Sequence, residues 1–222
     1  MTTPRRDFLS WLGAGGVAAG AGIPLPGRAP ADSMPRPVST KWDMTWADRV
    51  TGKMRAVFDS PGLADGAAMF RAQAWRKEYL DVYGGNAHDL SAVVVFRHEA
   101  IPLVMNDAFW ERFKCGKENK IKDDKTKKWT TVNPVSGVQA GAPTAMADYN
   151  IPAFVAAGGI VLACNLAFGG MVAMVKKADK LSNDDARKKT IEMLVPGVIL
   201  QPSGFFAVLQ AQQAGCHYFP AS

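Results

Sequence analysis

Short apolar runs alternate with longer amphipathic segments along most of the chain. Residues 90–96 contain the run Ala-Val-Val-Val-Phe and residues 160–164 read Ile-Val-Leu-Ala-Cys, both typical of strands buried in a parallel sheet. Residues 53–59 alternate apolar and polar side chains, as a strand with two different faces does. Shorter apolar runs at 198–200 and 216–219 complete five predicted strands.

The segments between these strands have the 3.6-residue period of helices. Gly84-Gly85 ends the first of them, and Ser182-Asn183-Asp184-Asp185 is a helix-capping cluster. Alternation of strand and helix predicts a single α/β domain with a mostly parallel sheet and helices on both faces. Helices are expected over residues 63–83, 101–113, 144–157 with Pro152 at a turn or kink, 167–180, 183–194 and 204–214.

Residues 114–143 interrupt this rhythm. Seven lysines stand there against Glu118, Asp123 and Asp124, and a Gly/Pro-rich stretch closes the segment. A connection of this length without periodicity is either a functional lid or a solvated, hairpin-like excursion, and a run of charge favours the second.

The first 31 residues have the three parts of an export leader. Arg5-Arg6-Asp7-Phe8-Leu9 is close to the twin-arginine consensus, and residues 11–23 form an uncharged apolar stretch. Ala29-Pro30-Ala31 offers a cleavage site before Asp32; an uncleaved membrane anchor is the alternative, although the apolar stretch is short for one. The sequence therefore predicts a periplasmic protein exported by the twin-arginine machinery, with a polar lead-in over 32–52 and one domain over 53–220.

Charge and composition narrow the function classes. The formal net charge is +6, and removal of a leader that holds Arg5, Arg6 and Arg28 against Asp7 would lower it to +4. This surplus is mild and spread out, which argues against a nucleic-acid partner. Hydrophobic residues make up 48% of the chain, enough for one packed core.

The cysteines and histidines have no metal-binding or dithiol spacing. Three cysteines leave an odd thiol in an oxidising compartment, and none lies in a C-x-x-C pattern. Cys115 lies in the excursion and is expected to be exposed enough to form a disulfide or reach a partner, whereas Cys216 on the last strand is expected to be structural. We expect no metal site and no cofactor.

In open α/β sheets, ligands bind outside the carboxyl ends of the strands. Cys164 is the one obvious nucleophile there, and a helix starting just after it would favour the thiolate through its positive N-terminus. Its alternative role is a small apolar filler of the core. The residues expected at these strand ends are Asp59, Ser60, Arg97, His98, Cys164, Asn165, Gln201 and Ser203.

The second half of the chain resembles the DsrE/DsrF-like sulfur-relay family. The pattern is an apolar strand ending in Cys164, then Leu194-Val195-Pro196-Gly197-Val198-Ile199, a helix after Ser203-Gly204, and a closing His217-Tyr218-Phe219-Pro220 strand. In the first half, residues 93–98 and 101–107 are similar to that family's second strand and helix. The resemblance covers about residues 53–220 and is diffuse.

The resemblance implies a three-layer, five-stranded flavodoxin-like sheet, frequent homo- or hetero-oligomers, and a persulfide carried on Cys164. His98 or Arg97 would favour the thiolate, and Asp59 and Asn165 would support the site from neighbouring strand ends. The sequence departs from the family in two respects: the leader directs export, whereas the matched sulfur-relay proteins are cytoplasmic, and the 114–143 excursion is long.

Two hypotheses of different classes follow. The first is a periplasmic DsrE-like protein that binds or relays sulfane sulfur on Cys164, with a donor or acceptor protein as partner. The second is a non-catalytic, homo-oligomeric ligand-binding or assembly module without thiol chemistry, for which five tryptophans supply interface or pocket side chains. A nucleotide or flavin protein is weaker, because Gly84-Gly85, Gly158-Gly159 and Gly169-Gly170 lack the phosphate-loop spacing. The five tryptophans that follow the predicted leader are Trp42, Trp46, Trp75, Trp110 and Trp129.

Overall fold

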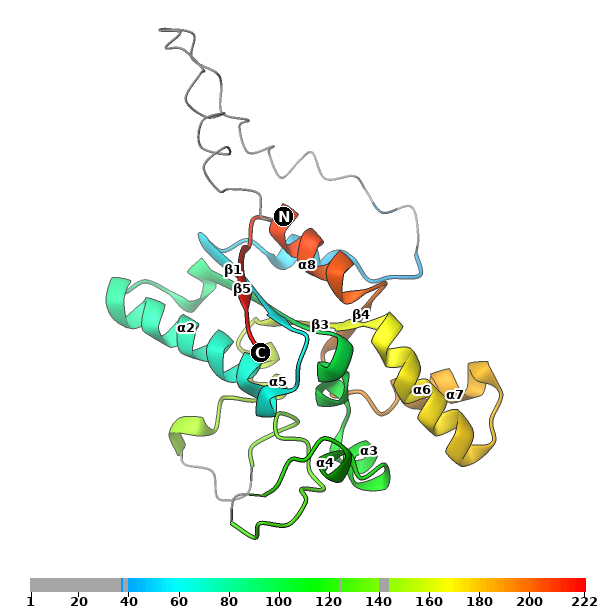
Figure 1. The fold of residues 1–222 in the computed structure, drawn as a ribbon. Coiled ribbons are helices and arrows are strands. Elements are labelled where there is room, and N and C mark those ends of the chain that lie inside the picture. The colour runs from blue at the N-terminus through cyan, green and yellow to red at the C-terminus, as the bar shows by residue number, and fades with distance from the viewer. Residues whose placement is uncertain (1–36, 38–39, 124, 140–143) are drawn as a thin grey trace, which may run out of the picture. The chain divides into compact units, whose positions relative to one another are not determined.

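Five strands form one sheet in the order β4-β3-β2-β1-β5, and every neighbouring pair is parallel. The computed structural model describes residues 37, 40–123, 125–139 and 144–222 (Figure 1). The fold class predicted from the sequence is confirmed: the protein is α/β, consistent with a flavodoxin-like three-layer arrangement. The strands are β1 (Met54–Ser60), β2 (Leu90–Phe96), β3 (Ile160–Cys164), β4 (Val198–Gln201) and β5 (His217–Pro220).

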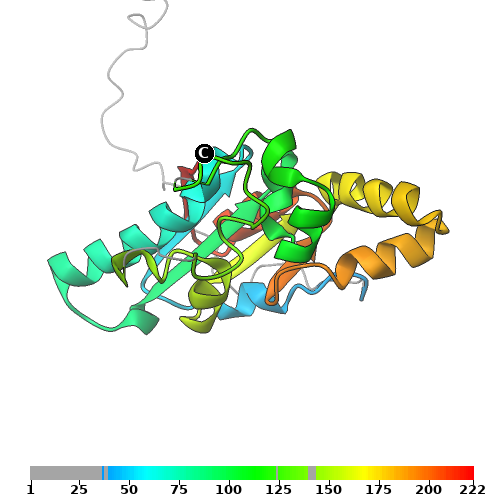
Figure 2. The same ribbon diagram turned by 90° about the horizontal axis from the view of Figure 1, so that it is seen from below.

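Helices cover both faces of this sheet (Figures 1 and 2). One face carries α2 (Ala67–Tyr83), α5 (Ile151–Ala156) and α6 (Asn165–Asp179), and the opposite face carries α8 (Gly204–Gln213). The connections β1–β2, β2–β3 and β3–β4 run over the first face, and only β4–β5 crosses the second. The remaining helices are α3 (Asp107–Arg112), α4 (Cys115–Glu118), α7 (Asn183–Ile191) and short 3₁₀ turns at Thr45–Arg49 (η2), Ala64–Gly66 (η3), Ala87–Asp89 (η4), His98–Val104 (η5) and Thr144–Met146 (η6).

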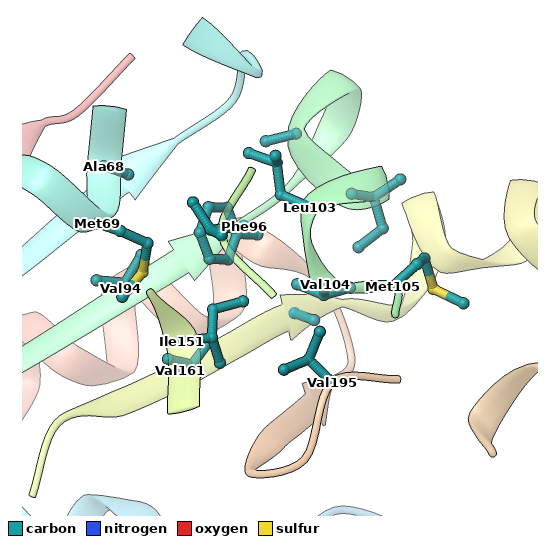
Figure 3. Packing of buried hydrophobic residues seen from close by; sticks show 14 of the residues in the cluster. Ala68, Met69, Val94, Phe96, Leu103, Val104, Met105, Ile151, Val161 and Val195 are labelled. Atoms are coloured by element: carbon teal, nitrogen blue, oxygen red, sulfur yellow. The ribbon is translucent and has the colours of Figure 1, made fainter. Parts of the chain in front are cut away.

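The larger core lies between the sheet and its α2–α5–α6 face (Figure 3). Phe96 at the end of β2 is fully buried at its centre, a burial that contributes roughly 2–3 kcal/mol. Side chains from the sheet, from α2, from η5 and from α5 meet around it. Those labelled in Figure 3 are Ala68, Met69, Val94, Leu103, Val104, Met105, Ile151, Val161 and Val195.

The segment before the first strand belongs to the fold. Trp46 on η2 is fully buried and Val50 nearly so, and both pack in the smaller core with α8 on the second face of the sheet. The polar lead-in predicted over 32–52 is therefore wrong for its second half. The sequence did not reveal this segment because a single helical turn is too short to produce a repeating pattern of apolar residues.

The helix predicted over 101–113 is two separate elements. Pro102 lies inside η5, where its missing N–H suits a short 3₁₀ turn better than a helix interior. The α-helix starts again only after Asn106, whose side chain accepts a hydrogen bond from the Phe109 N–H. Residues 100–104 are all buried, so this turn is a wall of the core and not a half-exposed helix.

The Lys-rich excursion is hairpin-like in part, with an isolated antiparallel bridge between Lys122 and Trp129. It is also anchored, because the buried Asn133 side chain donates hydrogen bonds to the carbonyl oxygens of Leu103 and Met105 at 2.8 and 2.5 Å. Cys115 is 4% exposed, so the expectation of an exposed thiol is wrong: α4 turns it into the core.

The predicted leader, residues 1–31, lies outside the described residues. Residues from 40 onward belong to one compact unit. In this part of the chain no helix is long and apolar enough to cross a bilayer.

Two serine caps allow the contributions of α8 and α7 to the free energy of unfolding to be compared. Ser203 is buried and caps α8 by accepting from the Phe206 N–H, whereas Ser182 is exposed and caps α7 by accepting from the Asp185 N–H. We expect Ser203→Ala to lower the free energy of unfolding by about 1.5 kcal/mol and Ser182→Ala by about 0.5–1 kcal/mol. Urea denaturation measures both, and a larger loss in Ser182→Ala would contradict this arrangement.

Candidate functional site

The carboxyl ends of the strands meet at one edge of the sheet, as the parallel topology requires. After β3 the chain turns to α6 on one face, and after β4 it turns to α8 on the other face. These two neighbouring strands, joined in register at Cys164 and Gln201, therefore form the topological switch point at which α/β proteins bind ligands.

An ion pair joins the ends of β1 and β2 at this edge. Arg97 donates from Nε and Nη2 to the two carboxylate oxygens of Asp59, at 2.7 and 2.9 Å. Tyr218 on β5 donates its hydroxyl to Asp59 Oδ2 at 3.0 Å. The carboxylate is buried and accepts all three of these hydrogen bonds, so the charge of Asp59 is well compensated.

Arg97 connects this ion pair to Cys164. Its hydrogen bonds to Asp59 raise the pKa of the guanidinium above its ordinary value, and a Cys164 thiolate would add a further attraction. By strand alternation Arg97 and Cys164 lie on the α8 side of the sheet, as do Val95 and Leu162. Arg97 and Cys164 therefore lie on the same side of the sheet, at the ends of neighbouring strands.

Glycine at position 204 keeps α8 close to this arginine. A Cβ atom there would come 2.4 Å from the Arg97 Cβ, which no real side chain tolerates. The start of α8 therefore lies directly over the stem of Arg97, and the arginine is fixed at both its base and its tip.

Cys164 ends β3 and directly precedes α6, a helix of 15 residues. Cys164 is therefore the N-cap residue of α6, at the positive end of the helix dipole. The residue is only 6% exposed. Chemistry at its sulfur therefore requires a small reagent or donor.

Asn165, the first residue of α6, supports the site through the helix. Its Oδ1 accepts a hydrogen bond from Arg187 Nη2 on α7 at 2.7 Å. At the other end of α6, Asp179 pairs with Arg112 and with Lys189, and these two partners lower the pKa of Asp179 to about 2. Both ends of α6 are thus tied to neighbouring helices, which holds its N-terminus in place beside Cys164.

His98 follows Arg97 but lies apart from these contacts. Its side chain is 73% exposed, and its Nε2 lies 4.0 Å from Glu99. The structure thus brings Asp59 and Arg97 together, places Cys164 at the end of the next strand on the same side of the sheet, joins Asn165 to α7 through Arg187, and leaves His98 at the surface.

Two further residues at the ends of strands, Gln201 and Ser203, are buried near the switch point. Gln201 is fully buried and donates from Nε2 to the Asp43 carbonyl at 2.8 Å, while its Oε1 accepts no hydrogen bond from any described residue. Ser203 is occupied as the cap of α8.

The other two cysteines are buried in the two cores. Burial raises the pKa of the Cys115 thiol to about 11, so it is protonated and unreactive near neutral pH. Cys216 packs in the α8-side core, in keeping with the structural role expected of it. All three cysteines are described, and no disulfide joins them. The described residues contain no group of three or more His, Cys, Asp or Glu side chains that could hold a metal ion.

Sequence reasoning missed Tyr218 and Arg187. The rule that ligands gather at strand ends points to Tyr218, because it lies on the last strand near its carboxyl end. No feature of the sequence points to Arg187, because it contacts Asn165 from a polar helix 22 residues further along the chain.

A separate cavity of about 630 Å³ lies between the excursion and the start of α2. Phe70 and Tyr149, whose ring centroids are 5.0 Å apart, form part of its wall, and Lys122 and Asp123 stand at its polar side. Its volume falls in the range of small-molecule sites.

Comparison of the chain with models of known protein families, with curated proteins and with solved structures finds no match. The resemblance to the DsrE/DsrF-like family therefore rests on the sequence pattern alone.

The ion pair can be tested against its hydroxyl partner. Asp59→Asn removes the charge that holds Arg97, and we expect it to cost about 2 kcal/mol of unfolding free energy, because the half-buried guanidinium is only partly rehydrated. Tyr218→Phe removes one hydrogen bond and should cost about 1 kcal/mol. Urea denaturation of both variants checks this order; an Asp59→Asn protein as stable as the wild type would contradict it.

Proposed function

We propose that this protein is a periplasmic DsrE-like sulfur carrier that holds sulfane sulfur as a persulfide on Cys164. The observation behind the proposal is the position of Cys164, at the topological switch point and the N-terminus of α6, with Arg97 close enough to attract its thiolate. Asp59 and Tyr218 would hold Arg97 in place, and Asn165 would hold the helix.

The transfer step is a displacement at sulfur. With thiosulfate as donor, the Cys164 thiolate attacks the outer sulfur, a new S–S bond forms, and the bond to the sulfonate sulfur breaks. Sulfite leaves with that electron pair, and the total charge is unchanged. An acceptor thiolate then takes the outer sulfur and returns Cys164 to the thiolate. Arg97 contributes by attracting both the thiolate and the anionic donor.

The sequence supports two further parts of this proposal. The resemblance in residues 53–220 favours the sulfur-relay class, and the twin-arginine leader favours action outside the cytoplasm. In that compartment a working thiol must be protected from irreversible oxidation. At 6% exposure the Cys164 sulfur is shielded from bulky thiols and disulfides, whereas small oxidants reach it as a small donor does.

Intact-mass measurement tests the carrier function. The full chain is incubated with thiosulfate, and we expect a gain of ~32 Da per persulfide. Cys164→Ser should abolish the gain. Cys216→Ser, the matched control at a buried cysteine in a core, should retain it. The absence of added mass on the wild type, or the same addition on Cys164→Ser, would overturn the proposal.

One observation favours a second candidate, a ligand-binding or assembly module without thiol chemistry. Cys164 is nearly as buried as the two core cysteines, and the 630 Å³ cavity beside the excursion lies away from it. Under this hypothesis Cys164 fills space, and the native protein leaves it unmodified by small thiol reagents. Labelling followed by peptide mapping separates the two candidates.

A further inference from the structure

The sheet ends at β5 with an uncovered surface. β5 is an edge strand, and all four of its residues are exposed. His217 and Phe219 pair in register with Ala56 and Phe58, which face the α2 side of the sheet. Helix α2 packs over β1 and β2, so Phe219 at the edge remains 46% exposed.

A groove of about 390 Å³ runs between α2 and β5, which we call the α2–β5 groove. Phe58 forms its floor, with the rings of Trp75 and Phe219 on either side at centroid distances of 5.8 and 5.7 Å. Phe70 extends its apolar surface along the helix, 46% exposed. A hollow that exposes this much aromatic surface is typical of a protein interface.

The helix side of the groove has a symmetrical charge pattern. Arg71, Ala74, Trp75 and Glu78 follow one another at i, i+3, i+4 and i+7, so they form one stripe along α2. The basic and the acidic residue stand at equal distances from the Ala74–Trp75 centre. Neither forms an ion pair with another residue that the structure describes.

We propose that the α2–β5 groove binds a second copy of this chain about a two-fold axis, with the two α2 helices antiparallel. A two-fold axis at Ala74–Trp75 places Arg71 opposite the partner's Glu78, and Glu78 opposite the partner's Arg71. The small Ala74 lets the helices approach closely, while Trp75 packs across the axis and the Phe219 surface is covered. The interface is self-complementary in charge, as an isologous contact requires.

This charge pattern distinguishes a second copy from an added strand. β5 is four residues long and ends at Pro220, which has no N–H to donate, so it is a poor template for β-augmentation. An extended peptide would also leave the Arg71–Glu78 stripe unmatched. The dimer does not depend on sulfur chemistry, because the groove contains neither Cys164 nor Arg97.

Charge reversal tests the pairing directly. The mass of the full chain in solution is measured by sedimentation velocity over a range of concentrations. We expect a dimer for the wild type, and dissociation constants at least about tenfold higher for Arg71→Glu and for Glu78→Arg, because each puts like charges face to face. The double variant with both changes should regain the dimer, since it restores opposite charges.

Lys188→Glu is the matched control for Arg71→Glu, since it makes the same change in net charge at an exposed position on α7, outside the groove. It should dimerise like the wild type. A monomeric wild type, single reversals that dimerise as the wild type does, or a double variant that stays dissociated would each overturn the proposal. Circular dichroism confirms that each variant is folded.

Discussion

The hydrogen-bonded ion pair between Asp59 and Arg97 is the constraint on which the carboxyl edge of the sheet depends. The buried carboxylate accepts two hydrogen bonds from the guanidinium and a third from Tyr218, so three strands, β1, β2 and β5, are joined at their ends by one side chain. The backbone oxygen of Asp59 also accepts a hydrogen bond from the Ala221 N–H at 2.7 Å, which fixes the C-terminus to the same point. A lone buried carboxylate would cost several kcal/mol, so each partner is needed.

The position of Arg97, held by Asp59, in turn determines the charge at the switch point. Gly204 lets α8 begin directly over Arg97, and α6 begins immediately after Cys164. Cys164 thus stands at the N-terminus of α6, the positive end of that helix dipole, and on the same side of the sheet as Arg97. The same pairing limits the effect, because Asp59 neutralises much of the arginine's charge. We therefore expect the attraction between Arg97 and an anion at Cys164 to be modest, about 1 kcal/mol.

Much of this architecture could be predicted from the sequence, and the failures have physical causes. The strands β2 and β3 begin and end where predicted, because runs such as Val93-Val94-Val95 are buried on both faces and have no other stable place. Pro102 broke the expected helix at 101–113, and the single turn that buries Trp46 was too short to show a period. Cys115 was expected at the surface because lysines surround it in the sequence. It is buried because the packing of α4 turns its side chain into the core while the charged neighbours stay outside.

The candidate site followed from topology more than from any motif. Asp59, Arg97, Cys164 and Asn165 were expected because the carboxyl ends of parallel strands share one edge, and the structure places all four there. Their mutual contacts could not be predicted, since the Asp59–Arg97 and Asn165–Arg187 pairs depend on register and helix orientation. The antiparallel pairing of Arg71 and Glu78 proposed for α2 likewise required the fold, because only the exposed edge at β5 shows that this helix stripe has no cover.

The electrostatic role of Arg97 at Cys164 is the central claim, and a pair of small thiol reagents tests it most directly. Methyl methanethiosulfonate is neutral, and its sulfonatoethyl analogue is anionic but reacts by the same displacement. The rates of Cys164 modification by both are measured in the wild type and in Arg97→Gln. Loss of about 1 kcal/mol of attraction should lower the anionic-to-neutral rate ratio about fivefold in the variant. An unchanged ratio would show that Arg97 does not act on this sulfur, and would contradict the account.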